Sequence, residues 1–308
     1  MSRRQSLRTL ATLLLASVAF SVAQVPAGTT EYALPGEGVF PEGVAYHASS
    51  ESAYVTGAAS GGLYRIHLAS EETETVLEPS TRPPFGMLGL AAHGDDLWIA
   101  GGNQGDVLRL NIATGEIEAT YPTPAAEATL INDLVVAPDG DVYVTDSNRP
   151  VLFRIPAGGS DVESWLDLDG SPITYGEGIN LNGIDVTDDG AYLIVVHMGE
   201  GALYRIDIDT KEIVHVDLGD GAVPGGDGLV LDGTTLYVVQ NGPDVVSVVE
   251  LSDDFASGTV TDTLAEGRLS SAATGALVGT DLLVTNAQFA AMEDEPDLPF
   301  TVAVVPTR

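Results

Sequence analysis

Four oxygen-bearing side chains occupy the same position in a pattern that repeats along the chain. They are Glu42, Asn132, Asn182 and Asp227, and each directly precedes a glycine or aspartate that begins an apolar run. If the repeat brings them to one axis, the two carboxylates repel each other unless a cation lies between them. Ligands that are all oxygens, with two negative charges, suit a hard divalent cation: Ca²⁺ first, with Mg²⁺, Mn²⁺ or Zn²⁺ as alternatives. The other interpretation is that these residues are turn formers at strand starts, which explains Glu42 poorly.

A second polar set occurs 12 to 15 residues further on, at the expected end of the next apolar run. Its polar members are Asp146, His197, Gln240 and Asn286. We expect them to surround the ion and to line a substrate pocket. His197 is the most reactive of them near neutral pH and could relay a proton, although a lone histidine after two valines is more often a packed residue.

Two loops of the predicted pocket carry apolar side chains. The loop 167–181 contains Tyr175, and the loop 287–299 contains Phe289 and Met292. These residues indicate an alkyl or aryl portion in the substrate.

A repeat of about 45 residues must position all of these side chains. Each unit contains short runs rich in Val, Ile, Leu and Tyr, separated by Asp-Gly or similar turns, which is typical of antiparallel strands. The units begin at Gly43, Gly89, Asp133, Gly183, Gly228 and Gly275. Leu88 and Thr274 precede the second and sixth of these anchors.

Four antiparallel strands per unit predict an all-β fold, a six-bladed β-propeller. The sixth unit ends without a fourth strand, and a spare strand lies at residues 29–35. We therefore predict that the N-terminal strand completes the last blade and closes the ring.

The N-terminal residues 1–23 predict an export signal peptide, because arginines precede a short apolar run and a small-x-small site. Residues 24–308 then form one propeller domain, in a periplasmic or extracellular protein. The 308 residues include no cysteine, which excludes disulfides, thiolate catalysis and cysteine-based metal sites. A formal charge of −33 disfavours nucleic acid and anionic membrane surfaces as partners. We expect a monomer that acts on a small-molecule substrate.

Four segments resemble signature segments of the SMP-30/gluconolactonase/LRE family. They are Pro41-Glu42-Gly43-Val44-Ala45, Ile131-Asn132-Asp133-Leu134, Leu181-Asn182-Gly183-Ile184-Asp185 and Gly226-Asp227-Gly228-Leu229. The resemblance implies a six-bladed propeller with a divalent cation in the central channel and an activity on lactones or esters; related enzymes hydrolyse organophosphates. It implies that Glu42, Asn182 and Asp227 are metal ligands, and that Asn132 is a fourth ligand or a substrate contact. Asp227 would also be the catalytic carboxylate, as base or nucleophile.

The resemblance is incomplete in the substrate pocket, because the aromatic and arginine residues that hold a sugar lactone in gluconolactonases have no clear counterparts here. A competing interpretation also comes from the sequence. The segment Leu108-RLNIATGEIEATY resembles YncE-like and NHL-like propellers, which are binding modules. On that interpretation the cation is structural or absent. The sequence thus predicts a metal-dependent lactone or ester hydrolase, with a non-catalytic binding propeller as the alternative.

Overall fold

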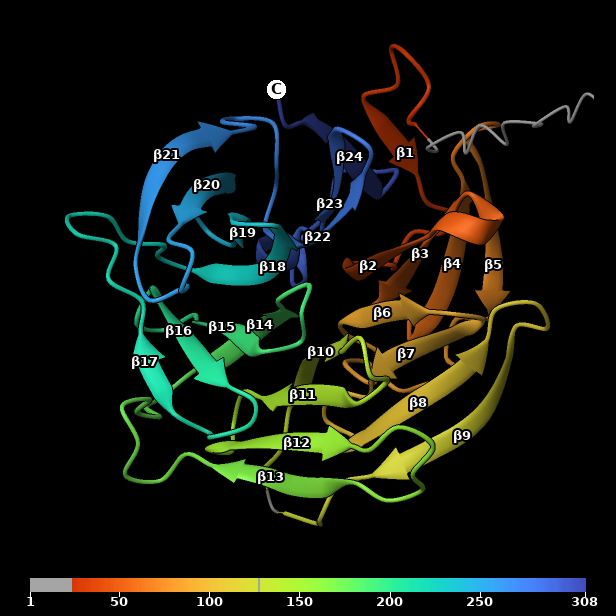
Figure 1. The fold of residues 1–308 in the computed structure, drawn as a ribbon. Coiled ribbons are helices and arrows are strands. Elements are labelled where there is room, and N and C mark those ends of the chain that lie inside the picture. Colours follow the sequence, from red (N-terminus) through yellow and green to blue (C-terminus); the bar gives the residue numbers. More distant parts are fainter. Residues whose placement is uncertain (1–23, 127) are drawn as a thin grey trace, which may run out of the picture.

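Short apolar runs separated by tight turns pair with their sequence neighbours to form six four-stranded antiparallel sheets. In the computed structural model, which describes residues 24–126 and 128–308, the sheets are arranged as blades around a central axis (Figure 1). The fold is a six-bladed all-β propeller, and the prediction of four strands per blade is confirmed. The predicted signal peptide, residues 1–23, lies outside the described residues.

The four strands of each blade are ordered from the axis outward. The inner strands are β2 (Pro41–His47), β6 (Leu90–His93), β10 (Ile131–Val136), β14 (Leu181–Val186), β18 (Gly226–Asp232) and β22 (Ala272–Val278). The second strands are β3 (Ser52–Gly57), β7 (Asp96–Ala100), β11 (Val142–Asp146), β15 (Tyr192–His197), β19 (Thr235–Gln240) and β23 (Asp281–Asn286). The third strands are β4 (Gly62–His67), β8 (Asp106–Asn111), β12 (Val151–Ile155), β16 (Ala202–Asp207), β20 (Val245–Leu251) and β24 (Thr301–Pro306). The outer strands are β5 (Glu72–Leu77), β9 (Glu116–Pro122), β13 (Glu163–Asp167), β17 (Ile213–His215), β21 (Gly258–Leu264) and β1 (Glu31–Ala33).

Helical structure in the described residues is limited to two 3₁₀ turns, η1 (Ala48–Ser50) and η2 (Phe289–Ala291). Within the same residues, no helix has the length and apolar character needed to cross a membrane.

The N-terminal strand β1 is the outer strand of the sixth blade, as predicted. It pairs antiparallel with β24, and Tyr32 lies opposite Val302. The side chains of Tyr32 and Leu34 are 1% and 3% exposed. Burial of these two side chains fixes the register of the closing strand, because a shift by one residue would turn them to solvent.

The hydrophobic core lies between blades rather than in a single centre. Six apolar clusters fill the six interfaces between neighbouring sheets. One cluster, for example, joins Val55 of the first blade to Leu283 and Val304 of the sixth. Because both faces of each sheet are covered, the second strands are almost continuously apolar and buried.

Candidate functional site

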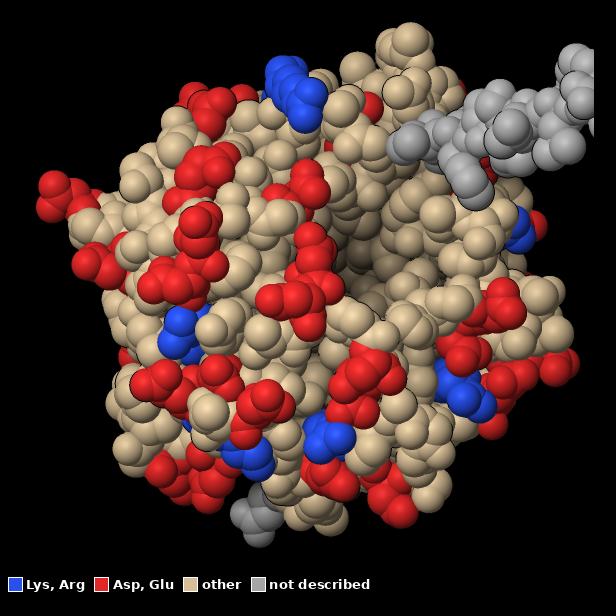
Figure 2. Space-filling model, viewed as in Figure 1, with Lys and Arg blue, Asp and Glu red and all other residues tan. Residues whose placement is uncertain are grey.

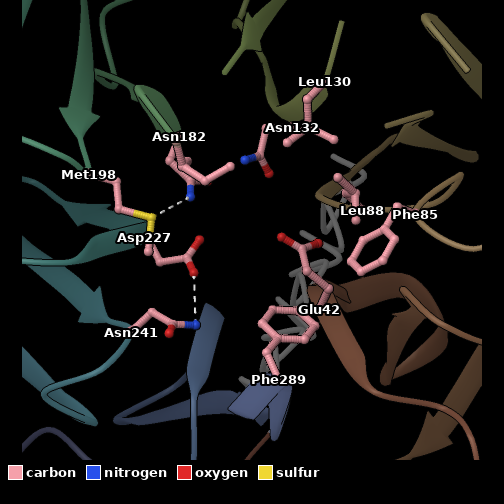
Figure 3. Close-up of a pocket in the computed structure, with 11 residues that line it drawn as sticks. Glu42, Phe85, Leu88, Leu130, Asn132, Asn182, Met198, Asp227, Asn241 and Phe289 are labelled. Atoms are coloured by element: carbon pink, nitrogen blue, oxygen red, sulfur yellow. Dashed lines mark hydrogen bonds between the residues drawn. The ribbon is translucent and has the colours of Figure 1, made fainter. Parts of the chain in front are cut away.

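All four residues of the first polar set line one cavity at the axis. The cavity has a volume of about 210 Å³, and Glu42, Asn132, Asn182 and Asp227 point their side chains into a common space (Figure 3). They come from four different inner strands, β2, β10, β14 and β18. The structure therefore brings together residues that are up to 185 positions apart, 227 − 42, in the sequence.

An irregularity in each inner strand places these side chains. The pairing between β2 and β3 shifts register between Pro41 and Val44, and Glu42 lies inside that shift. The same shift surrounds Asn132, Asn182 and Asp227 in their own blades. A bulge of this kind bends the strand and redirects a side chain out of the sheet. In four of the six blades, the bulge thus directs a polar side chain toward the axis.

The glycines that follow the bulged residues are required by the neighbouring blade. A Cβ on Gly183 would collide with the backbone of Asp227, and a Cβ on Gly43 would collide with that of Leu88. Absence of a side chain at these anchors therefore allows adjacent inner strands to approach closely. Their function is packing, and the conspicuous glycines in the sequence mark the axis of the propeller.

Threonines in the second strands join the bulges of adjacent blades. Thr145 donates to the backbone oxygen of Asn182 at 2.7 Å and accepts from the Asp133 amide at 3.1 Å. Thr56 in the first blade and Thr285 in the sixth make equivalent bonds. Thr285 donates to the backbone oxygen of Glu42 at 2.8 Å. We did not identify these residues from the sequence, although a Val-Thr pair at the end of β3, β11 and β23 was a visible signal.

The sixth blade differs from our alignment of the repeat by one position. The register shift there lies between Ala272 and Gly275, so Ala273 is the equivalent of Asn182, and Thr274 is the equivalent of an anchor glycine. The Thr274 hydroxyl donates to the backbone oxygen of Glu42 and accepts from the Val44 amide. Thr274 thus replaces a glycine because its hydroxyl bonds the first blade. The axial position is apolar in two blades, Leu88 and Ala273.

The cavity contains buried carboxylates and buried oxygens that no positive charge or hydrogen-bond donor of the described residues compensates fully. Burial, followed by the nearby charge of Asp227, raises the pKa of Glu42 well above its usual range. Burial and the charge of Asp133 raise the pKa of Asp227 in the same way. Glu42 Oε2 and Asn182 Oδ1 are buried without any hydrogen-bond partner. Because unpaired buried oxygens and repelling carboxylates are costly, this donor set fits a hard divalent cation.

Acceptors bind the NH₂ groups of Asn132 and Asn182. The Ser147 hydroxyl donates to the Leu181 oxygen at 2.6 Å, so its oxygen accepts from Asn132 Nδ2 at 2.8 Å. Met198 Sδ, which has no hydrogen to donate, lies 3.5 Å from Asn182 Nδ2. The Asn132 amide is thus fixed by Ser147, whereas the NH₂ group of Asn182 lies toward Met198 and Asp227 and leaves its buried oxygen without a partner. Within the described residues, no group of three or more His, Asp and Glu side chains could hold a metal, so an ion here depends on these amides.

The second polar set does not line this cavity, which corrects our expectation. Residues one position further along line it instead: Met198 after His197, and Asn241 after Gln240. Asn241 Nδ2 donates to Asp227 Oδ2 at 3.3 Å. Side chains alternate along a strand, so the last residue of each second strand faces away from the residue that follows it.

The second set instead holds the loops that lead into the inner strands. Asp146 accepts from the Leu130 amide at 3.0 Å, and Asn286 accepts from the Ser270 amide at 3.1 Å. Gln240 donates to the Pro224 oxygen at 2.8 Å. His197 Nε2 donates to the Thr174 oxygen, and its Nδ1 accepts from the Glu200 amide. Because both ring nitrogens bond to the backbone, His197 holds a loop in the structure. Its side chain does not line the cavity, so the structure gives no contact through which it would relay a proton.

The two predicted aromatic residues differ in position. Phe289 lines the cavity, whereas the Tyr175 hydroxyl donates to the Asp146 oxygen at 2.8 Å and its ring contacts His197 edge-on. The rest of the cavity wall is mostly apolar and includes Phe85 and Ile179. We did not identify Phe85 from the sequence as a residue of the pocket.

Comparison with known proteins places these observations in a family. Residues 40–269 match the family model described as SMP-30/gluconolactonase/LRE-like region. A calcium-binding protein, regucalcin, from Agrobacterium tumefaciens has a TM-score of 0.68 at 18% identity, over 91% of this chain and 95% of that one. A gluconolactonase from Xanthomonas campestris has a TM-score of 0.62 at 15% identity, over 88% and 86%. Virginiamycin B lyase from Staphylococcus aureus has a TM-score of 0.59 at 17% identity, over 83% and 80%.

These structural neighbours share the fold with this chain, and at such low sequence identity the similarity shows the fold alone. No curated protein sequence gives a significant match. The family model, however, spans most of the chain, including all four residues that point into the cavity. The chain therefore belongs to the SMP-30/gluconolactonase/LRE-like family.

Proposed function

We propose that this protein is an exported, metal-dependent hydrolase that opens a lactone or cleaves an ester. The observation that carries the proposal is the convergence of two buried carboxylates and two asparagine side chains on one cavity, with buried oxygens left unpartnered. Membership of a family that includes gluconolactonases supports the hydrolytic activity. Export rests on the signal-like pattern of residues 1–23. The cavity volume suits a small molecule, and the acidic surface disfavours nucleic acid and anionic lipid as partners.

Glu42, Asn132, Asn182 and Asp227 are the residues that would hold the cation. When bound, a divalent cation supplies positive charge that polarises a carbonyl and stabilises the negative charge developing on its oxygen. Ser147, Met198 and Asn241 orient three of these side chains before any substrate arrives.

Asp227 is the residue we assign to the chemical step, because its carboxylate faces the cavity and is held on one side by Asn241. As a base, Asp227 takes a proton from water while the water oxygen bonds to the carbonyl carbon. The carbon–oxygen bond to the leaving alkoxide then breaks, and Asp227 returns the proton to that oxygen. As a nucleophile, Asp227 would bond to the carbonyl carbon itself, and the bond to the leaving alkoxide would break as that oxygen takes a proton from water. The resulting hydroxide would then add to Cγ of Asp227 and release the acyl group as the carboxylate product, with the remaining proton passing to solvent. A single turnover in ¹⁸O-labelled water puts the label in the product in the first case and in Asp227 in the second.

The proposal is tested by assaying a γ-lactone, an aryl ester and a phosphotriester with and without a chelator. We expect hydrolysis of a lactone or ester that is lost with chelator, restored by Ca²⁺ and lost in Asp227→Asn. Asp217→Asn, at an exposed β-bridge to Ser257 between β17 and β18 in the sequence, is the matched control and should retain activity. If all three substrates are inert while Ca²⁺ still binds, the protein is a binding propeller and the hydrolase proposal is wrong.

A further inference from the structure

The cavity at the axis has two chemically different parts. Oxygen atoms of the four inward-pointing residues form its base, and apolar side chains form most of the surrounding wall. The apolar residues are Phe85, Leu88, Leu130, Ile179, Met198 and Phe289. None of the described residues that line the cavity is basic. A ligand of this wall therefore meets hydrocarbon and no positive charge.

Three of the six apolar side chains lie together on one side of the cavity. Figure 3 shows Phe85, Leu88 and Phe289 beside Glu42, opposite Asp227 and Asn241. Leu88 occupies the axial position of the second blade, where four other blades carry a polar residue. Phe85 lies in the loop before β6, and Phe289 lies in the loop after β23. The three residues therefore form an apolar wall, contributed by the second and sixth blades, next to the oxygens.

The wall is supported differently at its two ends. Phe289 packs against two of the apolar clusters between blades, which holds its ring in place. Phe85 is 37% exposed and lies at the mouth of the cavity. A substituent that extends from the oxygens to the mouth would pass Leu88 and Phe289 and then reach Phe85.

Hydrogen-bond donors that could serve a substrate are scarce in this cavity. The amide groups of Asn132, Asn182 and Asn241 each direct an N–H at a protein acceptor, Ser147, Met198 and Asp227. A polyhydroxylated lactone would bury several hydroxyl groups against hydrocarbon without partners, which weakens binding. An alkyl group would instead gain about fourfold in affinity for each methylene buried.

We propose that the substrate is a neutral lactone or ester whose alkyl or aryl group lies against Phe85, Leu88 and Phe289. The inference rests on the hydrolase function proposed above and specifies its substrate class. The carbonyl group lies at the oxygen base of the cavity and the hydrocarbon group lies along the wall. A sugar lactone is a poor substrate of this site.

The first test compares γ-lactones with alkyl substituents of increasing length and D-glucono-δ-lactone, using the full-length protein with Ca²⁺. We expect kcat/KM to rise about fourfold per methylene until the wall is covered, and to be lowest for the sugar lactone. A kcat/KM that is independent of alkyl length, or highest for the sugar lactone, overturns the inference and leaves the hydrolase function standing.

Variants assign the preference to the wall. Phe85→Ala should reduce the ratio of long-chain to short-chain kcat/KM by about tenfold. Phe289→Ala should do the same. The matched control is Leu298→Ala, because Leu298 is 49% exposed and does not line the cavity. An equal loss for long and short substrates in Phe85→Ala would contradict the proposed placement.

A binding measurement separates the two proposals. Alkyl-substituted γ-lactams, which keep the carbonyl but resist hydrolysis, are titrated into the Ca²⁺-loaded wild-type protein by calorimetry. Affinity that increases with alkyl length supports the apolar wall even if no ester or lactone is hydrolysed, in which case only the hydrolase function fails. Affinity that ignores alkyl length overturns the substrate class.

Discussion

At the scale of single residues, the orientation of a side chain matters as much as its identity. The amides of Asn132 and Asn182 are oriented because Ser147 Oγ and Met198 Sδ accept from their NH₂ groups. Sequence reasoning identified both asparagines from their position in the repeat. It could not identify the partners that orient them, because contact between Asn182 and Met198 depends on how two strands pair.

The charge of Glu42 makes it the sharpest probe of the proposed metal centre. Glu42→Gln removes one of the two carboxylates that face the cavity, and we expect Ca²⁺ affinity to fall by about 100-fold. Leu88→Ala, at the same repeat position, should leave affinity unchanged and lower the free energy of unfolding by about 2–5 kcal/mol. Calorimetric titration with Ca²⁺ and denaturant unfolding measure the two effects. Equal losses of Ca²⁺ affinity in both variants would show that the axial position does not define the site.

Asp185 predicts a dependence of stability on pH. It accepts from the amides of Val186 and Leu231, and burial raises its pKa to about 6; Asp133 and Asp188 are the charged groups near it. Because the folded state holds this proton more tightly than the unfolded state, Asp185 lowers stability as pH rises from about 4 to above 6. Asp185→Asn should therefore be relatively more stable at pH 7 than at pH 4.5, measured as the difference in Tm from the wild type. A difference in Tm that is the same at both pH values would contradict this prediction.

At the scale of strands and blades, the repeat predicted the elements well and the facing of their ends less well. The four bulged positions were identified because polar residues recur before a small anchor. We expected the second set to line the cavity, whereas Asp146 and Gln240 hold loops in the structure. The sequence does not show the register shift in the inner strand, and this shift decides which residues of the two paired strands lie side by side near the axis. In the sixth blade, the glycine signal pointed to Gly275, whereas Thr274 takes the anchor position through its hydroxyl bonds.

The threonine bonds between blades should be measurable as stability. Thr285 donates to the backbone oxygen of Glu42 and accepts from the Thr274 amide, at the junction of the last and first blades. Thr285→Val keeps the shape and removes both bonds, so we expect the free energy of unfolding to fall by about 1–3 kcal/mol. Thr280→Val, on an exposed turn of the same blade, is the control and should change it by less than about 0.5 kcal/mol. Urea unfolding monitored by tryptophan fluorescence distinguishes them, and equal effects would mean that the bonds contribute nothing.

At the scale of the whole molecule, negative charge dominates the surface. Figure 2 shows Asp and Glu side chains spread over one face, with few Lys and Arg among them and a hollow near the centre of the ring. The chain has 45 acidic and 12 basic residues. Ion pairs at the surface, such as Arg65 with Glu74 at 3.3 Å, contribute little, and only a few pairs, such as Arg149 with Asp146, are largely buried. Stability therefore rests on the apolar interfaces between blades.

Self-repulsion of this charge predicts stabilisation by salt. Raising NaCl from about 10 mM to about 1 M shortens the Debye length from about 30 Å to about 3 Å, which screens repulsion between distant carboxylates. We expect Tm to increase over this range. Calorimetric scans with excess chelator keep cation binding at the axis out of the measurement, and KCl should act like NaCl. A Tm that stays constant or falls would show that repulsion does not limit stability.

The pairing of β1 with β24 also bears on how the protein is made. β1 leaves the ribosome first and β24 last, so the closing contact has the largest sequence separation of any strand pair, Tyr32 with Val302. Contacts between distant residues form slowly because a long loop must close first. Until residue 306 is available, Tyr32 has no sheet to cover it and β23 presents an open edge. A translation product cut short in the sixth blade would thus carry an unpaired strand at each end, a form that can pair with its own copies and aggregate.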